Sequence, residues 1–258
     1  MDPGVVRDAL TLLGGIGTGV MSGLFGVGGA VISTPMIRAL GCTAALAVGT
    51  TLPSILPGAV TGSAKFSSEK LVSATTVASA APPGILASVV GSRVSHLLPG
   101  NGHPLMILTA ALLLWCGISL LRSGSSHTEL IPAKHPKAAA ALTGVSAGML
   151  SGLLGIGGGI VMVPMFRSRL GLSMKSAVAT SLVCVGCFAI PGTIVHAFVN
   201  HDIDWRFALW LTVGVIPGAI LGAALALRVH EDRLKKLFGT FLVIISIVYA
   251  AGEFAALR

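Results

Sequence analysis

The sequence has few charged residues for its length, and this shortage decides the class of protein. Only 17 Lys and Arg and 9 Asp and Glu occur among 258 residues, and this share of 10% compares with about 25% in a typical soluble domain. Eight long stretches contain no charged residue. These stretches are 9–37, 39–64, 71–92, 94–121, 138–166, 176–201, 207–227 and 237–252. A soluble enzyme, a disordered chain and a nucleic-acid-binding domain are therefore excluded.

The uncharged stretches are long and apolar. Hydrophobic residues make up 53% of the chain, and the mean hydropathy is +0.91. A bilayer core requires about 20 apolar residues for each helical crossing. The sequence therefore predicts an all-α, polytopic helical membrane protein with about eight hydrophobic segments. We expect these segments at 8–40, 42–64, 71–93, 104–122, 138–168, 174–200, 206–229 and 234–256.

Acidic side chains are absent from all eight stretches, and cysteines are few. No cluster of His, Asp or Glu inside them could hold a metal, and no Walker loop or Ser/His/Asp set indicates an enzyme. We expect no metal and no cofactor. The four cysteines suggest no disulfide framework. Cys184 and Cys187 have the spacing of a redox motif, but in an apolar helix we interpret them as packing residues.

The net charge of +8 points to a membrane surface as a partner. In an apolar chain, Lys and Arg gather in loops that face anionic headgroups. The expected partner is therefore the lipid bilayer and not nucleic acid. We expect a multi-pass protein of the cell inner or plasma membrane, and a homodimer is an open alternative.

The second half of the chain repeats the first. GVMSGLFGVGGAVISTPM at 19–36 recurs as GMLSGLLGIGGGIVMVPM at 148–165, an offset of 129. Further along, AVGTTL at 47–52 recurs as AVATSL at 177–182. Internal repeats of this kind indicate duplicated structural units. We therefore expect two homologous halves of four segments each.

A polar stretch, RSGSSHTELIPAKHPK, lies between the halves. Its prolines and Ser/Gly steps are typical of a linker. The expected organisation is a first membrane repeat over 1–121, a linker over 122–137 and a second membrane repeat over 138–258.

The first segment of each half is interrupted by glycines and a proline. Such paired, broken segments are typical of transport sites, because irregular backbone inside a membrane is tolerated where it lines a cavity. If the segments at 8–40 and 138–168 cross fully, the repeats are parallel, and if they turn back, the repeats are inverted. The alternate loops hold eight and nine Lys and Arg residues, so the positive-inside rule cannot decide between them.

The repeated motif S-G-x-x-G-x-G-G is the main candidate for a binding site. In one interpretation, the glycines end one half-helix and begin another, whose N–H groups attract an anion. In the other, they are small residues that let helices approach closely. The candidate residues are Ser22, Gly26, Gly28, Gly29, Ser151, Gly155, Gly157, Gly158 and Gly159.

Polar side chains near the motif are further candidates. Thr50, Thr51, Thr180 and Ser181 could add hydroxyl donors to the path, although hydroxyls in helices often bond to the preceding turn. Another set combines the prolines with the arginines that follow them, for gating or anion attraction; the arginines are alternatively interfacial anchors. This set is Pro35, Arg38, Pro164 and Arg167. His196 is either a proton carrier or an interfacial residue, and Gly62 stands at the matching position of the first half.

The doubled motif from Gly19 to Pro35 and from Gly148 to Pro164 resembles the TauE/SafE family of sulfite exporters and 4-toluene sulfonate uptake permeases. The resemblance covers nearly the whole chain. It implies a secondary transporter that exports a small sulfur-containing anion, such as sulfite or the organosulfonate sulfoacetate, by alternating access. Ala30 stands where the second copy has Gly159, so the two half-sites need not be equivalent. Two alternatives stay open: an anion channel of the same fold, and a membrane scaffold or sulfur-handling redox protein.

Overall fold

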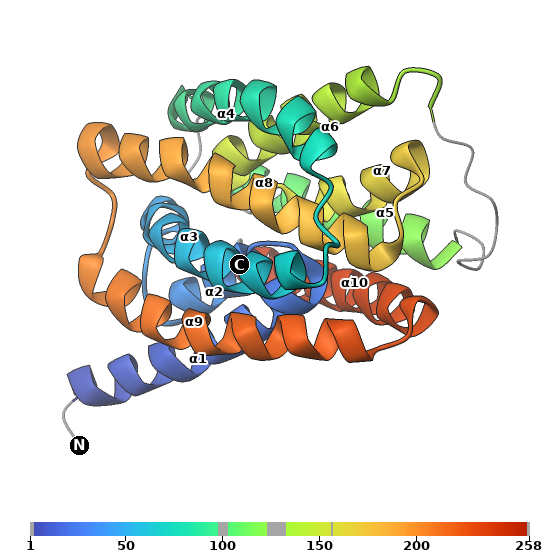
Figure 1. The fold of residues 1–258 in the computed structure, drawn as a ribbon. Coiled ribbons are helices and arrows are strands. Elements are labelled where there is room, and N and C mark those ends of the chain that lie inside the picture. The colour runs from blue at the N-terminus through green and yellow to red at the C-terminus, as the bar shows by residue number, and fades with distance from the viewer. Residues whose placement is uncertain (1–2, 98–102, 123–132, 156, 257–258) are drawn as a thin grey trace.

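The computed structural model describes residues 3–97, 103–122, 133–155 and 157–256 (Figure 1). Regular structure in this part of the chain is entirely helical, which confirms the all-α class. The helices are α1 (Pro3–Phe25), α2 (Ala30–Ala39), α3 (Ala44–Ser68), α4 (Ala74–Leu97), α5 (His103–Arg122), α6 (Pro136–Leu154), α7 (Gly159–Leu170), α8 (Met174–Val195), the π-helix η1 (His196–Asn200), α9 (Trp205–Arg228) and α10 (Glu231–Ala256).

Six of the described helices are long and apolar enough to cross a membrane. They are α1, α4, α6, α8, α9 and α10. α3, with Pro53 and Pro57 inside it, is not among them, and the apolar part of α5 is shorter, at Ile107–Arg122. The expectation of about eight spanning segments therefore stays a prediction.

Glycines in the left-handed conformation break the first and fifth segments. Gly26, Gly28 and Gly29 have φ of 71°, 86° and 82° between α1 and α2. The second break has the same conformation between α6 and α7, where Gly155, Gly157 and Gly158 have φ of 67°, 81° and 70°. A side chain is strained at such φ values, so these positions favour glycine.

The prolines do not make these breaks, contrary to what the sequence suggested. Pro35 lies inside α2 and Pro164 lies inside α7. Both helices continue through the proline, because the strained turn needed to reverse the chain is already supplied by the glycines before each helix.

The chain reverses direction after each break. The side chain of Met36 in α2 lies beside Gly14 of α1, so α2 runs back along α1. In the second half, the N–H of Ala133 donates to the carbonyl of Arg169 at 2.8 Å, so the chain leaving α7 lies beside the chain entering α6. Each pair, α1 with α2 and α6 with α7, is therefore a helical hairpin.

Stripes of small residues hold each hairpin against a helix of the other half. α1 packs along α9 and α6 packs along α4, in each case with the two helices parallel (Figure 1). The first stripe brings Gly15, Gly19 and Gly23 against Gly214, Gly218 and Gly222. The second brings Gly144, Gly148 and Gly152 against Ala80, Gly84 and Ser88. Small residues let helix backbones approach closely, so the packing interpretation holds for these glycines.

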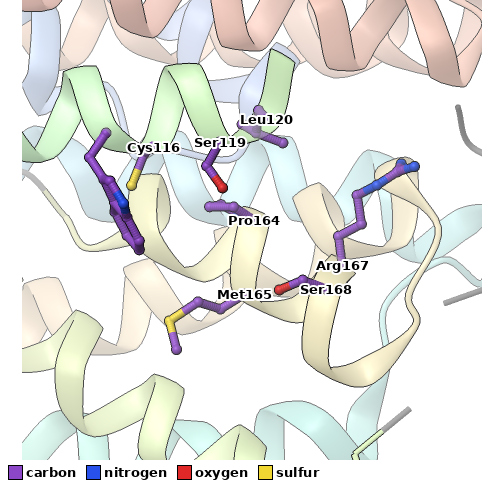
Figure 2. A pocket seen from close by; sticks show the side chains of 8 residues that line it. Cys116, Ser119, Leu120, Pro164, Met165, Arg167 and Ser168 are labelled. Atoms are coloured by element: carbon purple, nitrogen blue, oxygen red, sulfur yellow. The ribbon is translucent and has the colours of Figure 1, made fainter. Parts of the chain in front are cut away.

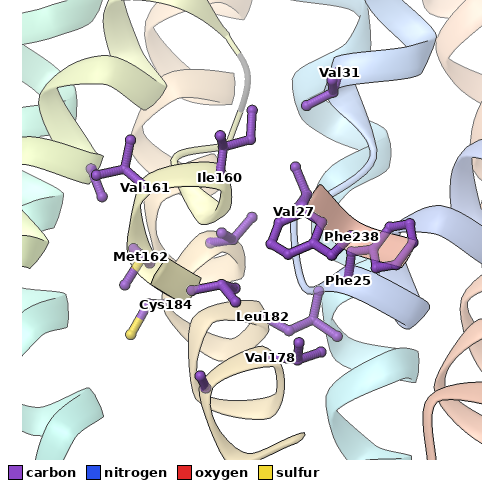
Figure 3. Close-up of a cluster of buried hydrophobic side chains, with 14 of the residues drawn as sticks. Phe25, Val27, Val31, Ile160, Val161, Met162, Val178, Leu182, Cys184 and Phe238 are labelled. Atoms are coloured by element: carbon purple, nitrogen blue, oxygen red, sulfur yellow. The ribbon is translucent and has the colours of Figure 1, made fainter. Parts of the chain in front are cut away.

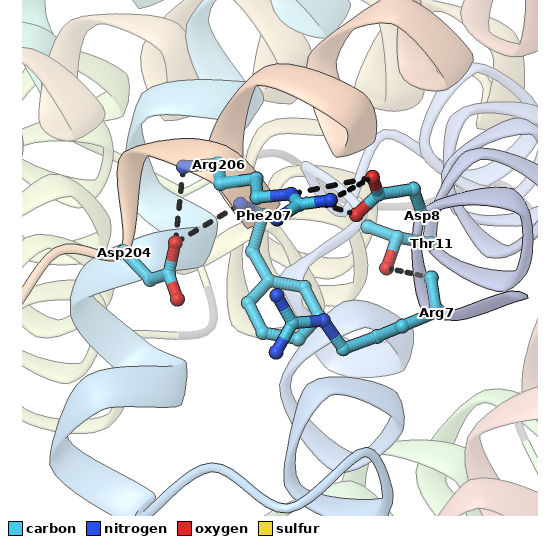
Figure 4. Close-up of polar contacts among 6 residues, drawn as sticks. All are labelled: Arg7, Asp8, Thr11, Asp204, Arg206 and Phe207. Carbon is cyan, nitrogen blue, oxygen red and sulfur yellow. Dashed lines mark hydrogen bonds and ion pairs between the residues drawn. The ribbon is translucent and has the colours of Figure 1, made fainter. Parts of the chain in front are cut away.

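The two hairpins enter the molecule from opposite ends. α1 and α9 begin at one end, which we call the α1 end, where Arg206 donates to Asp8 at 2.7 Å and Arg7 lies 4.7 Å above the ring of Phe207 (Figure 4). α4 and α6 run parallel from the other end, the α6 end, where α8 also begins, because the N–H of Ser73 donates to Thr180 there at 3.0 Å.

These contacts have the order that inverted repeats require. The division of the chain into two repeats and a linker stays a prediction from the sequence. Residues 123–132 of the expected linker lie outside the described part of the chain.

The apolar core surrounds the two breaks. Phe25, at the end of α1, stacks on Phe238 and Phe241 of α10 with ring centroids 5.0 Å apart in each case. Figure 3 shows Val27 on one side of this cluster and Ile160 on the other, with side chains of α8 between and below them. Both hairpin tips are therefore embedded in one core and exclude water.

We predict that Gly148→Ala destabilises the fold by about 1–3 kcal/mol, because an added Cβ would overlap the carbonyl oxygen of Gly84. Gly17→Ala in α1 is the matched control, since a Cβ there meets nothing within 4 Å, and it should change stability by less than about 1 kcal/mol. Thermal unfolding in detergent measures both. Equal losses in the two variants would contradict close backbone packing at Gly148.

Candidate functional site

The two glycine breaks meet inside the protein. A Cβ on Gly159 would lie 2.7 Å from the Cα of Val27, and one on Gly157 would lie 3.0 Å from the carbonyl oxygen of Val27 and 3.8 Å from the Cα of Gly28. We call this place the glycine junction and define it by residues 26–30 together with 155 and 157–160. Every one of these residues is buried. Two segments far apart in the sequence therefore form one enclosed region.

The junction holds two helix N-termini. α2 begins after the N-cap residue Gly29 and α7 after the N-cap residue Gly158, and neither N-cap supplies a side-chain hydrogen bond. The first-turn N–H groups of a helix have no acceptor within the helix, and the helix dipole adds partial positive charge at this end. Neither first turn contains an acidic residue. The junction is thus electropositive without a charged side chain, and such a place suits an anion.

The motif serines supply buried hydroxyls to the same region. Ser22 and Ser151 are each 1% exposed, and neither Oγ has a hydrogen-bond partner within the described residues. Their carbonyls accept from the N–H of Gly26 and Gly155 at 2.8 Å, so the two halves share one local geometry. A buried hydroxyl without a partner costs free energy. Contact of these hydroxyls with a ligand stays a prediction.

Thr18 is a third buried hydroxyl that the sequence analysis missed. Its Oγ1 has no partner within the described residues, and a Cβ on Gly29 would lie 2.6 Å from its Cγ2. The repeat offset places Ala147 at the matching position, beside Gly158. Comparing the two halves for such differences would have marked Thr18. The junction is thus asymmetric and has its extra hydroxyl beside α2.

Ala30 and Gly159, the departure noted between the two motifs, differ for a steric reason. A Cβ on Gly159 would overlap the carbonyl oxygen of Gly26, so only glycine fits at that contact. Ala30 is the first residue of α2, and its helical backbone accepts a Cβ.

Two of the predicted hydroxyls join neighbouring helices. Thr50 Oγ1 accepts from the N–H of Asp204 at 2.9 Å, and Thr180 Oγ1 accepts from the N–H of Ser73 at 3.0 Å. Asp204 is the N-cap of α9, and Ser73 precedes α4. These hydroxyls therefore tie matching helices together at the two ends of the molecule. A contact of either with substrate stays a prediction.

The other two predicted hydroxyls bond to backbone carbonyls. Thr51 donates to the carbonyl of Val48 at 3.0 Å, one turn earlier in its own helix. Ser181 donates at 2.9 Å to the carbonyls of both Val178 and Gly26. Ser181 thus fixes the first break against α8 and supports the junction. Its role in substrate binding, like that of Thr51, is untested.

The predicted gating residues lie away from the junction. Arg38 and Arg167 are in the last turns of α2 and α7, where a cation is favourable beside the helix C-terminus. Arg167 is only 5% exposed and lines a cavity of about 90 Å³ together with Trp115, Ser119 and Pro164 (Figure 2). Anion attraction by these arginines and gating by the prolines stay predictions.

The described residues contain no group of three or more His, Cys, Asp or Glu side chains that could hold a metal. Cys184 is buried and Cys187 is partly buried on α8, and both thiols are free. The chemistry of the junction is therefore that of backbone N–H groups and hydroxyls.

A comparison with known protein families identifies the family of this chain. The model of the family described as sulfite exporter TauE/SafE matches residues 11–249 of the chain. The chain belongs to the TauE/SafE family. The resemblance seen in the doubled motif is thereby confirmed, and the matched region includes both hairpins and the whole glycine junction.

Several proteins that are similar to this chain are named as membrane transporters. A "Probable membrane transporter protein" of Xylella fastidiosa (strain 9a5c) is 29% identical over 98% of both chains. YjnA of Bacillus subtilis (strain 168), a "Probable membrane transporter protein", is 26% identical over 90% of this chain and 96% of its own. MJ0441 of Methanocaldococcus jannaschii, with the same description, is 26% identical over 92% and 93%. No solved structure matches the chain significantly.

The TauE/SafE chain is thus a multi-pass membrane transporter. The six apolar helices and the names of the relatives agree on this class. Its family and relatives indicate transport and not catalysis.

We predict opposite effects on stability from two serine substitutions. Ser151→Ala removes a buried hydroxyl without a partner, so stability should stay the same or rise by up to about 1 kcal/mol. Ser181→Ala removes the bond to Gly26 and should lower stability by about 1 kcal/mol. Denaturant or thermal unfolding measures both. A clear loss in Ser151→Ala would show that its hydroxyl has a structural partner and does not await a ligand.

Proposed function

We propose that this protein is a secondary transporter that exports a small sulfur-containing anion, sulfite or an organosulfonate such as sulfoacetate, across the cell inner or plasma membrane. The observation that supports the proposal is the glycine junction. Two helix N-termini meet there in a buried region, and the hydroxyls of Ser22 and Ser151 have no partner within the described residues.

The donors of the junction suit a compact oxyanion. Backbone N–H groups and hydroxyls are neutral donors, and a set of them favours an anion with several acceptor oxygens packed close together. Sulfite and sulfonate groups have three such oxygens on one sulfur. The absence of Asp and Glu from the charge-free stretches removes the side chains that would repel an anion. The family description, sulfite exporter, agrees with this class of substrate.

The opposed hairpins provide a basis for alternating access. Each hairpin reaches the junction from its own end of the molecule, and each is fixed to a helix of the other half. Movement of one hairpin and its partner helix against the other pair would open the junction towards one end at a time. For export, the membrane potential is a sufficient driving force, since moving one charge is worth about 2.3 kcal/mol per 100 mV.

Counterflow in proteoliposomes tests this proposal. Labelled sulfite is added outside vesicles that contain unlabelled sulfite, sulfoacetate, sulfate or acetate. We predict saturable, trans-stimulated uptake with sulfite or sulfoacetate inside. Ser22→Ala and Ser151→Ala should each raise the apparent KM about tenfold, because a hydrogen bond to a charged ligand contributes about 1.5–3 kcal/mol. Ser67→Ala, an exposed serine near the end of α3, is the control and should transport normally.

The alternatives give different outcomes in the same vesicles. High conductance without saturation or counterflow would indicate an anion channel of the same fold. Loss of function in a Cys184→Ser/Cys187→Ser variant would favour a sulfur-handling redox protein, whereas a carrier should tolerate both changes. Folded protein that exchanges none of the tested anions would contradict the proposed substrate class.

A further inference from the structure

A hydrogen-bonded histidine and aspartate lie largely buried at the α1 end of the molecule, outside the glycine junction. The Nδ1 of His196 is 2.8 Å from Oδ1 of Asp202, and the two side chains are only 3% and 14% exposed. The second carboxylate oxygen of Asp202 is buried and has no hydrogen-bond partner in the described part of the chain. In an apolar environment, an unbalanced carboxylate is costly. This pair therefore needs an explanation beyond stability.

The backbone around the pair is irregular. His196 begins the π-helix η1 (His196–Asn200), and His201 has a left-handed φ of 52°. π-Helical turns are rare and are frequent at functional sites. A left-handed residue other than glycine is strained, and such strain persists where the surrounding structure holds it.

The first half of the chain has no counterpart of this histidine. Pro57-Gly58 of α3 recurs as Pro191-Gly192 of α8, and this local offset of 134 places Gly62 at the position of His196. Gly62 is buried in α3, where an added Cβ would lie 2.7 Å from a methyl group of Leu182. The matching helix end thus uses plain apolar packing. The pair of His196 and Asp202 is an addition to one half and not a requirement of the duplicated scaffold.

Two contacts join the pair to the start of α3. The carbonyl of Asp202 lies against the Cα of Gly49, where a Cβ would overlap it. Two residues later, the N–H of Asp204 donates to Thr50 Oγ1 at 2.9 Å. The turn that carries Asp202 therefore contacts two consecutive residues of α3, Gly49 and Thr50.

α3 in turn contacts both glycine breaks. A Cβ on Gly155 would overlap the side chain of Val48, and one on Gly28 would lie 3.3 Å from the Cγ2 of Ile55. Val48 is the immediate neighbour of Gly49. A continuous path of contacts thus runs from the Asp202 turn through Gly49 and Val48 of α3 to the second break of the junction.

The other charged groups near the pair are already engaged. Asp204 caps α9 by accepting from the N–H groups of Arg206 and Phe207 at 3.0 and 3.2 Å. Arg7 and Asp204 are the charged neighbours of Cys42, at the loop before α3. His201 is exposed, and α3 has no charged residue from its start to Ala64. From α8, which precedes η1, Lys175 lies at the opposite end.

We infer that the pair of His196 and Asp202 is a proton-binding site that couples proton movement to anion transport. This inference rests on the proposed function. A proton taken up by the imidazole changes the charge of the pair from −1 to 0, with no other bond made or broken. Loss of this negative charge at the α1 end favours the entry of an anion. By reciprocity, a bound anion favours the proton, so anion and proton move in the same direction. A dianion such as fully ionised sulfite or sulfoacetate then still carries one net negative charge, on which the membrane potential acts outward.

Proteoliposomes separate the coupling from the transport. Counterflow of labelled sulfite is first measured at equal pH on both sides. Net uptake is then measured with the outside one pH unit more acidic, with protein-free vesicles as the control for passive entry. With the membrane potential held at zero by potassium and valinomycin, one coupled proton allows a concentration ratio of about tenfold per pH unit. We predict accumulation approaching this ratio in the unaltered protein, and its loss in Asp202→Asn and His196→Gln.

The variants are expected to keep counterflow within about twofold, because exchange does not need proton release. Asp204→Ser is the matched control, since serine retains an N-cap oxygen for α9 while removing a neighbouring carboxylate. It should retain accumulation. Since sulfite can itself carry a proton, sulfoacetate, whose acidic groups are fully ionised at neutral pH, is the second labelled probe for the same variants.

Each outcome decides the inference. Counterflow in the unaltered protein without any effect of the pH difference overturns it and leaves the proposed function intact. Equal accumulation in Asp202→Asn, His196→Gln and the unaltered protein also overturns it, because the proton then travels on the substrate. Absence of counterflow with both probes overturns the proposed function, and the inference with it. If Asp202→Asn does not fold, the result for His196→Gln and the unaltered protein decides.

Discussion

Two chain reversals inside an apolar interior are the constraint on which this structure depends. Each reversal requires left-handed backbone, which Gly26, Gly28 and Gly29 supply in one half and their counterparts supply in the other. Each reversal also places the first N–H groups of a helix, which have no acceptor within the helix, in a buried region. The same feature that lets the hairpins turn back therefore creates an electropositive, buried region. A ligand anion is the natural partner of such a region.

Close packing around the hairpins keeps the two reversals together. The stripes of small residues on α1 and α6 fix each hairpin to a helix from the other half. Ser181 adds a hydrogen bond from α8 to the first break. The scaffold is arranged alike in both halves, but the polar side chains differ. Ala147 stands at the position in the second half that corresponds to Thr18, and Gly62 stands at the position in the first half that corresponds to His196. Directional coupling in a transporter requires such differences between its two ends.

The sequence predicts the local features of this fold well. The helical class follows from the long apolar stretches, and the breaks follow from the repeated glycines. The motif serines lie buried beside these breaks, and their role in binding stays a prediction. The prediction that a proline helps to interrupt each segment was wrong, since Pro35 and Pro164 lie inside helices. Whether the first and fifth segments cross or turn back depends on contacts such as Met36 with Gly14, which no local pattern encodes. An even distribution of cations left the same question open.

Long-range hydrogen bonds were equally hidden from the sequence. Thr50 and Thr180 look like lining residues in their helices, yet their partners, Asp204 and Ser73, are more than a hundred residues away. The partner of His196 lies only six positions along the chain, but a π-helix brings Asp202 to it, and helical periodicity does not predict that turn.

The position of a bound anion tests the central claim most directly. Selenite has the shape and charge of sulfite, and selenium gives an anomalous signal in X-ray diffraction. Crystals of the protein grown with selenite should show one strong anomalous peak between the first turns of α2 and α7, within hydrogen-bond distance of Ser22 or Ser151. A peak beside Arg38 or Arg167 with none at the glycine junction would contradict the account.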